Sequence, residues 1–394
     1  MIPLKLTLFM GILGVLVAYN SFIEHPKRVG EVLSLILFSV LGMMLMIRAN
    51  DLLIVFLGVE LLSIGFYVLA GAFRKDVLSN EAAVKYLVLG AVSTAFLLMG
   101  IALIYGIAGS TNFPQIASFV QGEMSTSPIF WLSGIFLLAG LGFKIALVPF
   151  HFWSPDVYQG APTAITAWMA SVPKIAGFIV LFEIFVNVFR SKLPFFGVSQ
   201  DFLLQTVALL TMIIGNFSAL RQTDLKRMLA YSSIAHAGYI FVAIIIGNAA
   251  NGAMNFYIFV YPLMNFAAFL FLLIWKGNNT EIKQFTGLGR KHAGIGIAMS
   301  VVLFSLAGFP PFAGFIAKYG IFVSAIQHEY YLLTIVGILT SFVSVYYYLN
   351  VVVTLFMKDE STVEFEIDAK SNAWLFGLLA ISLVVLGVVP SLIY

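Results

Sequence analysis

Cysteine is absent from this chain, and charged side chains are scarce. None of the 394 residues is Cys, so the sequence offers no disulfide framework and no thiolate ligand for zinc or an iron–sulfur cluster. Only 10% of the residues are charged, and no basic cluster is interleaved with aromatics, which excludes a nucleic-acid-binding surface. The sequence also lacks a phosphate-binding glycine loop, a metal-ligand cluster and a nucleophile triad. We therefore expect no cofactor, no metal and no redox chemistry in this chain itself.

Long apolar runs occupy most of the chain instead. Hydrophobic residues make up 61% of it, and the mean hydropathy is +1.01, as in membrane proteins. A transmembrane helix needs ~20 apolar residues. On this basis the predicted spans are twelve: 4–22, 30–48, 51–72, 82–108, 128–150, 161–189, 202–220, 228–247, 253–275, 293–328, 332–357 and 372–393. The first run lacks a small-residue cleavage site, so we predict a retained span rather than a signal peptide. The expected fold is an all-α polytopic membrane protein with a single transmembrane domain over residues 1–394.

The basic residues in the loops predict the orientation. The side that holds the N-terminus carries four of the 21 basic residues: Lys5, Arg48, Arg190 and Lys192. Thirteen lie on the other side, among them Lys226 and Arg227, which we interpret as topology signals, and the remaining four fall inside spans. This bias places the second side in the cytoplasm and both termini on the non-cytoplasmic side.

The stretch from Leu138 to Trp153 combines an amine, a helix breaker and a histidine. Lys144 lies inside an apolar run, and Pro149 removes a backbone donor five residues later. His151 follows Lys144 by seven residues, so the two share a face at roughly 10 Å spacing if the helix persists. A lysine and a histidine beside a broken helix indicate proton handling inside the membrane. The structural alternative is a lysine that only fixes helix packing.

Two more ionisable residues lie in earlier spans. Glu60 is near the middle of its span, where a carboxylate costs several kcal/mol unless it is protonated or paired. We expect Glu60 to be the partner of Lys144, the alternative being a hydrogen bond to a neighbour such as Ser63. Lys85 follows Glu81 by four residues, the favourable order for an ion pair on a helix. Lys85 can also be a lysine that snorkels from a helix end.

The second half of the chain contains a similar set. Lys174 directly follows Pro173, and its alternative role is a structural ion pair. His236 follows three hydroxyl residues, and its ordinary pKa of ~6.5 suits a proton relay, although a histidine among small residues can equally be a packing residue. Lys318 follows Pro310 and Pro311, where a broken helix is tolerated only if protein or water satisfies its backbone.

The two breaks recur at corresponding places. Each lies in the fourth of five predicted spans, and a repeat with an odd number of spans is inverted in the membrane. We therefore predict two inverted five-helix repeats, each with one discontinuous helix. They cover residues 30–189 and 202–357 and are flanked by the helices 4–22 and 372–393.

These stretches together resemble the N subunit family (the mitochondrial subunit 2 counterpart) of respiratory NADH:quinone oxidoreductase, complex I. A lysine at Lys318, where several related subunits carry glutamate, and the short C-terminal end are both similar to this family. Bacterial members usually have fourteen spans, so the resemblance implies two fewer N-terminal spans here and puts Glu60 on the third span rather than the fifth. The matching stretches are LGVELLSIGFYVLAG around Glu60, EAAVKYLVLGA around Lys85, GFKIALVPFHFWSPDVYQGAP around Lys144, SVPKIAGF around Lys174, DLKRMLAYSSIAHAGY through His236, and GFPPFAGFIAKY around Lys318.

The resemblance also implies roles. Glu60 and Lys144 form the coupled pair of a first half-channel, Lys174 and the histidines lie on a hydrated central axis, and Lys318 is the exit-side lysine of a second half-channel. Quinone reduction elsewhere in the complex then drives the proton. The candidate proton-translocation residues are Glu60, Lys85, Lys144, His151, Lys174, His236 and Lys318.

The implied partners are other membrane-arm subunits, including neighbouring antiporter-like and small subunits, together with the lipid bilayer. Flavin and iron–sulfur clusters are expected in partner subunits, and quinone is expected to be used by the complex without binding here. The expected location is a bacterial inner (plasma) membrane. Three other functions stay open from the sequence: a sodium/proton antiporter subunit, a membrane-bound hydrogenase subunit, and a scaffold whose buried charges only fix helix packing.

Overall fold

A computed structural model describes residues 2–23, 26–120, 127–189, 199–275, 279–358, 366–368 and 372–393. Over these ranges the regular structure is helical, with three isolated backbone bridges and no strand. The first half of the chain holds α1 (Ile2–Phe22), α2 (Pro26–Arg48), α3 (Leu52–Ala70), α4 (Val77–Ala108), α5 (Phe113–Val120), α6 (Pro128–Ile145), α7 (Trp153–Gly160), α8 (Thr163–Ser171) and α9 (Pro173–Phe182). The second half holds α10 (Gln200–Ala219), α11 (Leu225–Ile246), α12 (Asn251–Leu272), α13 (Leu288–Lys291), α14 (Ala293–Ala307), α15 (Ala313–Gln327), α16 (Tyr331–Phe356) and α17 (Ala373–Val388).

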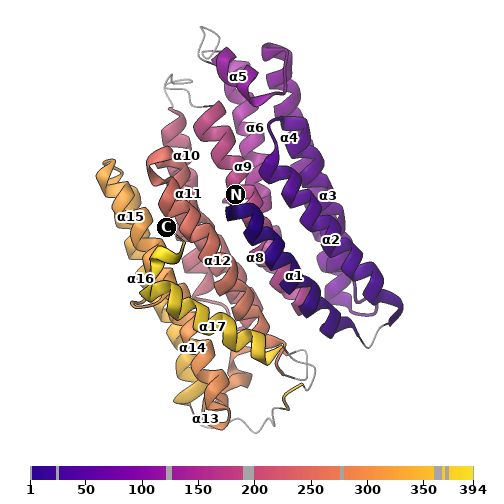
Figure 1. The fold of residues 1–394 in the computed structure, drawn as a ribbon, viewed down its shortest axis with the longest axis vertical. Helices are drawn as coiled ribbons and strands as arrows, with labels where there is room; N and C mark the ends of the chain where they lie inside the picture. The colour runs from indigo at the N-terminus through magenta and orange to yellow at the C-terminus, as the bar shows by residue number, and fades with distance from the viewer. Residues whose placement is uncertain are drawn as a thin grey trace.

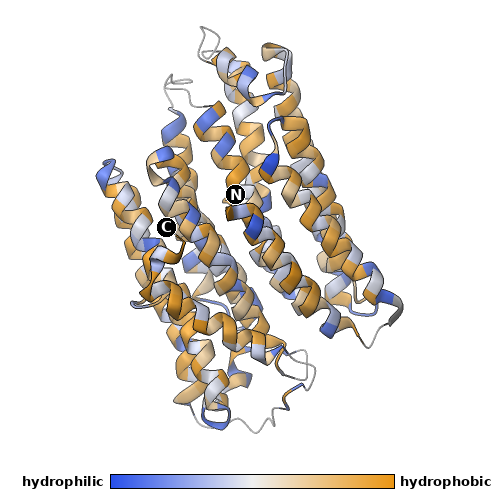
Figure 2. Ribbon diagram, in the orientation of Figure 1, coloured by the Kyte–Doolittle hydropathy of each residue, from blue (hydrophilic) through white to orange (hydrophobic). Residues whose placement is uncertain are grey.

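The all-α membrane class predicted from the apolar runs is confirmed. Within the described ranges, ten helical segments are long and apolar enough to cross a membrane, and α14, α15 and α17 are shorter apolar helices. Apolar residues colour the helices along most of their length, with hydrophilic residues gathered mainly near helix ends (Figure 2). The spans α2, α3 and α4 alternate in direction. The guanidinium of Arg28 at the start of α2 donates to the carbonyl of Ala72 after α3, and at the opposite end Asp51 bridges to Asn112.

The predicted long segment 293–328 is one broken helix, as expected. It consists of α14 and α15, and Gly308 ends α14 with a φ of 88°, a left-handed conformation that glycine adopts without strain. The polypeptide then passes through Pro310 and Pro311 before α15 begins at Ala313. The lack of a proline N–H explains why the helix cannot continue through this segment.

The first break lies earlier than expected from the position of Pro149. α6 ends at Ile145, one residue after Lys144, because Ala146 adopts φ 60° and the N–H of Leu147 closes the helix on the carbonyl of Gly142 at 2.9 Å. The N–H of Val148, freed by the break, donates to Oγ1 of Thr211 at 3.0 Å. The condition for Lys144 and His151 to share a face, a helix that persists through both, is therefore not met, since α6 ends at Ile145 and α7 begins only at Trp153.

The helices form an elongated bundle in which the first half of the chain, α1 to α9, lies beside the second half, α10 to α17 (Figure 1). The halves meet where α12 packs on α8 and α11 packs on α7. α11 is the most enclosed span: 94% of its most apolar stretch is buried, against 33% for α4. A polar side chain on α11 is therefore kept away from lipid.

Candidate functional site

Glu60 and Lys144 lie close to each other without forming an ion pair. Oε1 of Glu60, on α3, accepts a hydrogen bond from the hydroxyl of Thr94 on α4 at 2.7 Å. The amine of Lys144 donates to Oγ of Ser63 at 2.7 Å and to the hydroxyl of Tyr67 at 3.4 Å. Ser63 and Tyr67 follow Glu60 on α3 by three and seven residues, which places all three on one face of the helix. Ser63, about one helical turn after Glu60 on α3, thus occupies the position next to the amine.

Aromatic rings enclose Lys144. Its side chain is only 6% exposed, and its amine lies 5.3 Å from the ring centre of Phe143 and 5.7 Å from that of Tyr67, within the range of cation–π attraction. Tyr67 contacts Tyr86 edge to face at 4.9 Å, and Tyr86 stacks on Trp153 at 4.5 Å. Lys144 is in the last turn of α6, where the helix dipole favours a cation. The site can therefore hold a protonated lysine without an adjacent carboxylate.

Lys174 lies in the first turn of α9 and is 1% exposed. Its amine donates to the carbonyl of Ser233 at 2.7 Å and to the Ser233 hydroxyl at 2.5 Å. The hydroxyl of Tyr261 donates to the same serine at 2.8 Å, and Asn265 donates to Tyr261 at 3.0 Å. α9 thereby connects to α11 and α12 through polar side chains in the centre of the bundle.

His236 continues this polar cluster on α11. Its Nδ1 lies 2.8 Å from the hydroxyl of Tyr257, and its Nε2 lies 3.4 Å from that of Tyr348 on α16. Tyr348 also bonds the hydroxyl of Ser232, and the His236 ring lies 5.5 Å from the ring of Tyr261. At 2% exposure, His236 is in contact with hydroxyl groups that both donate and accept hydrogen bonds.

Lys318 lies on α15 just beyond the second break. Its amine donates to the carbonyl of Ala307, the last residue of α14, and to the hydroxyl of Ser341 on α16, both at 2.9 Å. It also lies 5.0 Å from the ring centre of Tyr239, which contacts His236 edge to face at 5.9 Å. The lysine therefore satisfies a carbonyl at the end of the broken helix, which lipid could not do.

Lys174, His236 and Lys318 thus form one buried row along α11. One face of α11 carries Ser233, His236 and Tyr239 at three-residue spacing. On this face Ser233 contacts Lys174, Tyr239 contacts Lys318, and His236 lies between them. The sequence predicted the three ionisable groups but missed the tyrosines that connect them. Tyr257, Tyr261 and Asn265 recur every four residues on α12, a polar stripe that helical periodicity could have revealed.

His151 lies apart from this row. It is 5% exposed, follows the break after α6, and packs its ring at 4.4 Å on that of Phe152. Its Nδ1 has no hydrogen-bond partner in the part of the chain that the structure describes. The structure therefore gives His151 no shared helical face with Lys144 and no contact with the row on α11.

Lys85 belongs to a different cluster. Its amine pairs with Glu81 at 2.7 Å, as the four-residue spacing indicated, and with Asp156 of α7 at 2.7 Å. Asp156 also pairs with Arg227 at 2.6 Å. Sequence reasoning missed Asp156 and took Lys226 and Arg227 as loop charges that only set the topology. Lys226 is in fact 5% exposed and donates to the carbonyl of Ala161 at 2.7 Å.

The comparisons with known proteins show the family of the chain. The family model for the transmembrane region of NADH:quinone oxidoreductase and Mrp antiporters matches residues 49–344. Subunit N of NADH-quinone oxidoreductase from Trichlorobacter lovleyi is 45% identical over 388 residues, which are 97% of this chain and 79% of that protein. Subunit N 1 from Chloroherpeton thalassium is 42% identical over 97% of this chain and 80% of its own length.

Solved structures share the fold. A chain of respiratory complex I from Thermus thermophilus with bound aureothin superimposes with a TM-score of 0.84 at 35% identity, over 99% of this chain and 85% of that one. A chain of the Mrp complex from Dietzia superimposes with a TM-score of 0.85 over 99% of this chain and 81% of that one, but at 21% identity it supports the fold alone. The chain therefore belongs to the transmembrane family of NADH:quinone oxidoreductase and Mrp antiporters. Within that family it groups with the N subunits of NADH-quinone oxidoreductase, which confirms the resemblance drawn from its motifs.

Proposed function

We propose that this chain, as an N subunit of NADH-quinone oxidoreductase, moves protons across the membrane through two half-channels. One observation carries the proposal: Lys144, Lys174 and Lys318 are all buried, and none has an ion-pair partner among the described residues. Each donates instead to hydroxyl and carbonyl oxygens. A buried lysine without a fixed counter-ion can gain and lose a proton. A charged group inside the membrane is costly, so its presence there indicates a function.

The first half-channel contains Glu60 and Lys144. Glu60 borders a cleft of about 450 Å³ between α3 and α4 that opens to the outside of the bundle, so a change in a neighbouring subunit can reach this carboxylate. Because Ser63 separates Glu60 from the amine by one turn of α3, a shift of the Lys144 amine from Ser63 toward Glu60 stabilises its protonated form. The neutral hydroxyl of Ser63 stabilises the protonated amine less than the Glu60 carboxylate does, so a shift back favours release of the proton.

The second half-channel follows the row along α11. The end of α6 adjoins α9 closely, since a Cβ on Gly177 would lie 2.5 Å from the Ile145 side chain. This contact brings the two helices together, and the proposed path runs from the surroundings of Lys144 to Lys174, and then through the hydroxyls around His236 to Lys318. Quinone reduction in other subunits supplies the energy, and flavin and iron–sulfur clusters belong to those subunits. This chain contributes the proton path.

The same proposal includes the placement of the chain. The breaks between α6 and α7 and between α14 and α15 support two inverted repeats over residues 30–189 and 202–357. We place the chain in a bacterial inner membrane, and the excess of basic residues on one side supports an orientation with both termini on the non-cytoplasmic side. The other membrane-arm subunits and the lipid bilayer are the partners.

Replacing Lys144 tests the proposal. In membrane vesicles that contain the assembled complex, we expect Lys144→Met to lower donor-driven proton pumping at least tenfold, because the amine at the centre of the first half-channel is gone. Lys283→Met is the matched control, since Lys283 is exposed in the short 3-10 helix Ile282–Phe285 between α12 and α13. Mass spectrometry of the native-gel band that contains the chain checks assembly and identifies the partner subunits. Normal pumping by the assembled Lys144→Met complex would contradict the half-channel.

A further inference from the structure

We propose that Asp156 is a positioning residue: it holds α7, the second limb of the first broken helix, between α4 and α11, and thereby sets the surroundings of Lys144. This inference rests on the proposed function, since it concerns the same proton path. It assigns Lys85 and Arg227 to an ionic clamp on α7 rather than to the proton path or to the loops.

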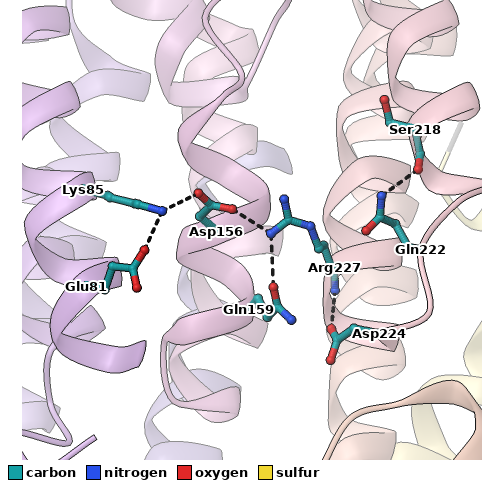
Figure 3. Close-up of polar contacts among 8 residues, drawn as sticks. All are labelled: Glu81, Lys85, Asp156, Gln159, Ser218, Gln222, Asp224 and Arg227. Atoms are coloured by element: carbon teal, nitrogen blue, oxygen red, sulfur yellow. Dashed lines mark hydrogen bonds and ion pairs between the residues drawn. The ribbon is translucent and has the colours of Figure 1, made fainter. Parts of the chain in front are cut away.

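The clamp is a line of alternating charges across three helices (Figure 3). Oδ2 of Asp156 accepts from the amine of Lys85 on α4 at 2.7 Å, and its Oδ1 accepts from Nη1 of Arg227 on α11 at 2.6 Å. Glu81 pairs with Lys85 at 2.7 Å, and Oε1 of Gln159 accepts from Nη1 of Arg227 at 3.1 Å. Two acids and two bases balance one another, and Asp156 contacts both bases from the centre.

A second contact from α11 holds the other end of α7. Asp224 caps α11 by accepting from the N–H of Arg227 at 2.8 Å, which places Lys226 and Arg227 in the first turn. Lys226 donates to the carbonyl of Ala161, directly after α7, where the helix dipole favours a cation. On the α4 side, a Cβ on Gly160 would lie 2.5 Å from the carbonyl of Leu78, so the two backbones touch.

α7 depends on such contacts. It has eight residues, and a helix of that length is not stable alone in the absence of packing. The break after α6 also removes the backbone continuity that would otherwise keep α7 in line with α6. Its position is therefore determined by the groups that bind it from two helices: α4 in the first half of the chain and α11 in the second half.

The position of α7 is transmitted to Lys144 through side chains. The indole N–H of Trp153, the first residue of α7, donates to the carbonyl of Phe143 at 2.9 Å, next to Lys144. Trp153 also stacks on Tyr86, the neighbour of Lys85, and Tyr86 contacts Tyr67, whose hydroxyl accepts from the Lys144 amine. A displacement of α7 therefore disturbs two of the groups that enclose this amine.

The clamp lies partly exposed at the surface of this chain. The side chains of Lys85, Asp156 and Arg227 are 41%, 33% and 30% exposed, and ion pairs at such positions are weak because solvent screens them. The clamp can therefore loosen and close again during turnover. Ion pairs that hold two helices together permanently would be more deeply buried.

Variants of Asp156 in the assembled complex test the clamp. We expect Asp156→Asn to lower the initial rate of donor-driven proton pumping per assembled complex at least threefold. We expect Asp156→Glu to restore more than half of the original rate, because glutamate keeps the carboxylate that binds Lys85 and Arg227. Asp51→Asn is the matched control. Asp51 caps α3 on the other side of the bundle, asparagine caps a helix equally well, and the rate should stay unchanged.

A double substitution separates the clamp from a general loss of packing. If Lys85 acts through Asp156, then Lys85→Gln combined with Asp156→Asn lowers the rate no further than Asp156→Asn alone. If the Asp156→Asn complex does not assemble, two variants of Lys85 replace it. We then expect Lys85→Gln to lower the rate at least threefold and Lys85→Arg, which keeps the charge, to restore more than half of it. A full rate in an assembled charge-removing variant, or multiplicative effects in the double variant, would overturn the clamp.

If Lys144→Met pumps normally, the proposed function fails. If Lys144→Met is inactive while Asp156→Asn pumps fully, only the clamp fails.

Discussion

Replacement of Ser63 by alanine tests how Lys144 is held in its protonated form. Oγ of Ser63 accepts from the Lys144 amine at 2.7 Å and donates to the carbonyl of Val59. Ser63 is 1% exposed and the Lys144 side chain 6%, so water does not simply replace the lost oxygen. After the substitution the amine keeps only the longer bond to Tyr67, at 3.4 Å.

The expected magnitude follows from the charge on the donor. A hydrogen bond to a charged group contributes about 1.5–3 kcal/mol, and each 1.4 kcal/mol changes a rate about tenfold. If the protonated amine loses this stabilisation, it accepts a proton less readily, and proton pumping falls at least about tenfold. The assay is the acidification rate of inverted membrane vesicles upon addition of the electron donor, normalised to the assembled complex on a native gel.

Ser133→Ala is the control for this experiment. Ser133 is also buried, and it lies in the first half of α6, away from Lys144. Its hydroxyl donates to the neutral carbonyl of Gly100 at 2.9 Å. Its loss costs about 1 kcal/mol of stability and leaves pumping unchanged. Pumping within twofold of the parent in assembled Ser63→Ala would refute the argument, because it would mean that Ser63 does not stabilise the working form of Lys144.

Two further predictions concern the row along α11 and the second break. Tyr257→Phe removes the hydroxyl 2.8 Å from His236 Nδ1 but keeps the ring, so we expect about fivefold slower pumping for a lost bond of ~1 kcal/mol; an unchanged rate in the same vesicle assay would contradict a role in the path. Gly314→Ala puts a Cβ 1.8 Å from the carbonyl of Ser305, so α15 must move at a cost of about 1–3 kcal/mol, and the native gel should show less assembled complex. Gly377→Ala, which meets open space, is its control, and equal bands for both variants would contradict the packing argument.

The sequence alone determined the class and predicted one break near Pro149 and another at Pro310 and Pro311. A helix that crosses lipid must satisfy its own backbone and present an apolar surface, so its position can be recognised from the run of residues that forms it. The same reasoning identified the buried lysines, because a charge in the middle of an apolar run must face protein or water. Lys174, directly after Pro173, and Lys318, seven residues after Pro311, were found in this way. The motifs around them also sufficed for the family.

Only the tertiary structure decided which groups these side chains contact. Lys144 binds Ser63, 81 residues away, rather than Glu60, and Lys85 binds Asp156, 71 residues away. The end of α6 was likewise decided by Ala146 and not by Pro149 alone. Apolar length and helix breakers act within one segment, so the sequence displays them directly. A hydrogen bond or an ion pair instead depends on distances of a few tenths of an ångström between separate helices, and these are established only when the helices pack.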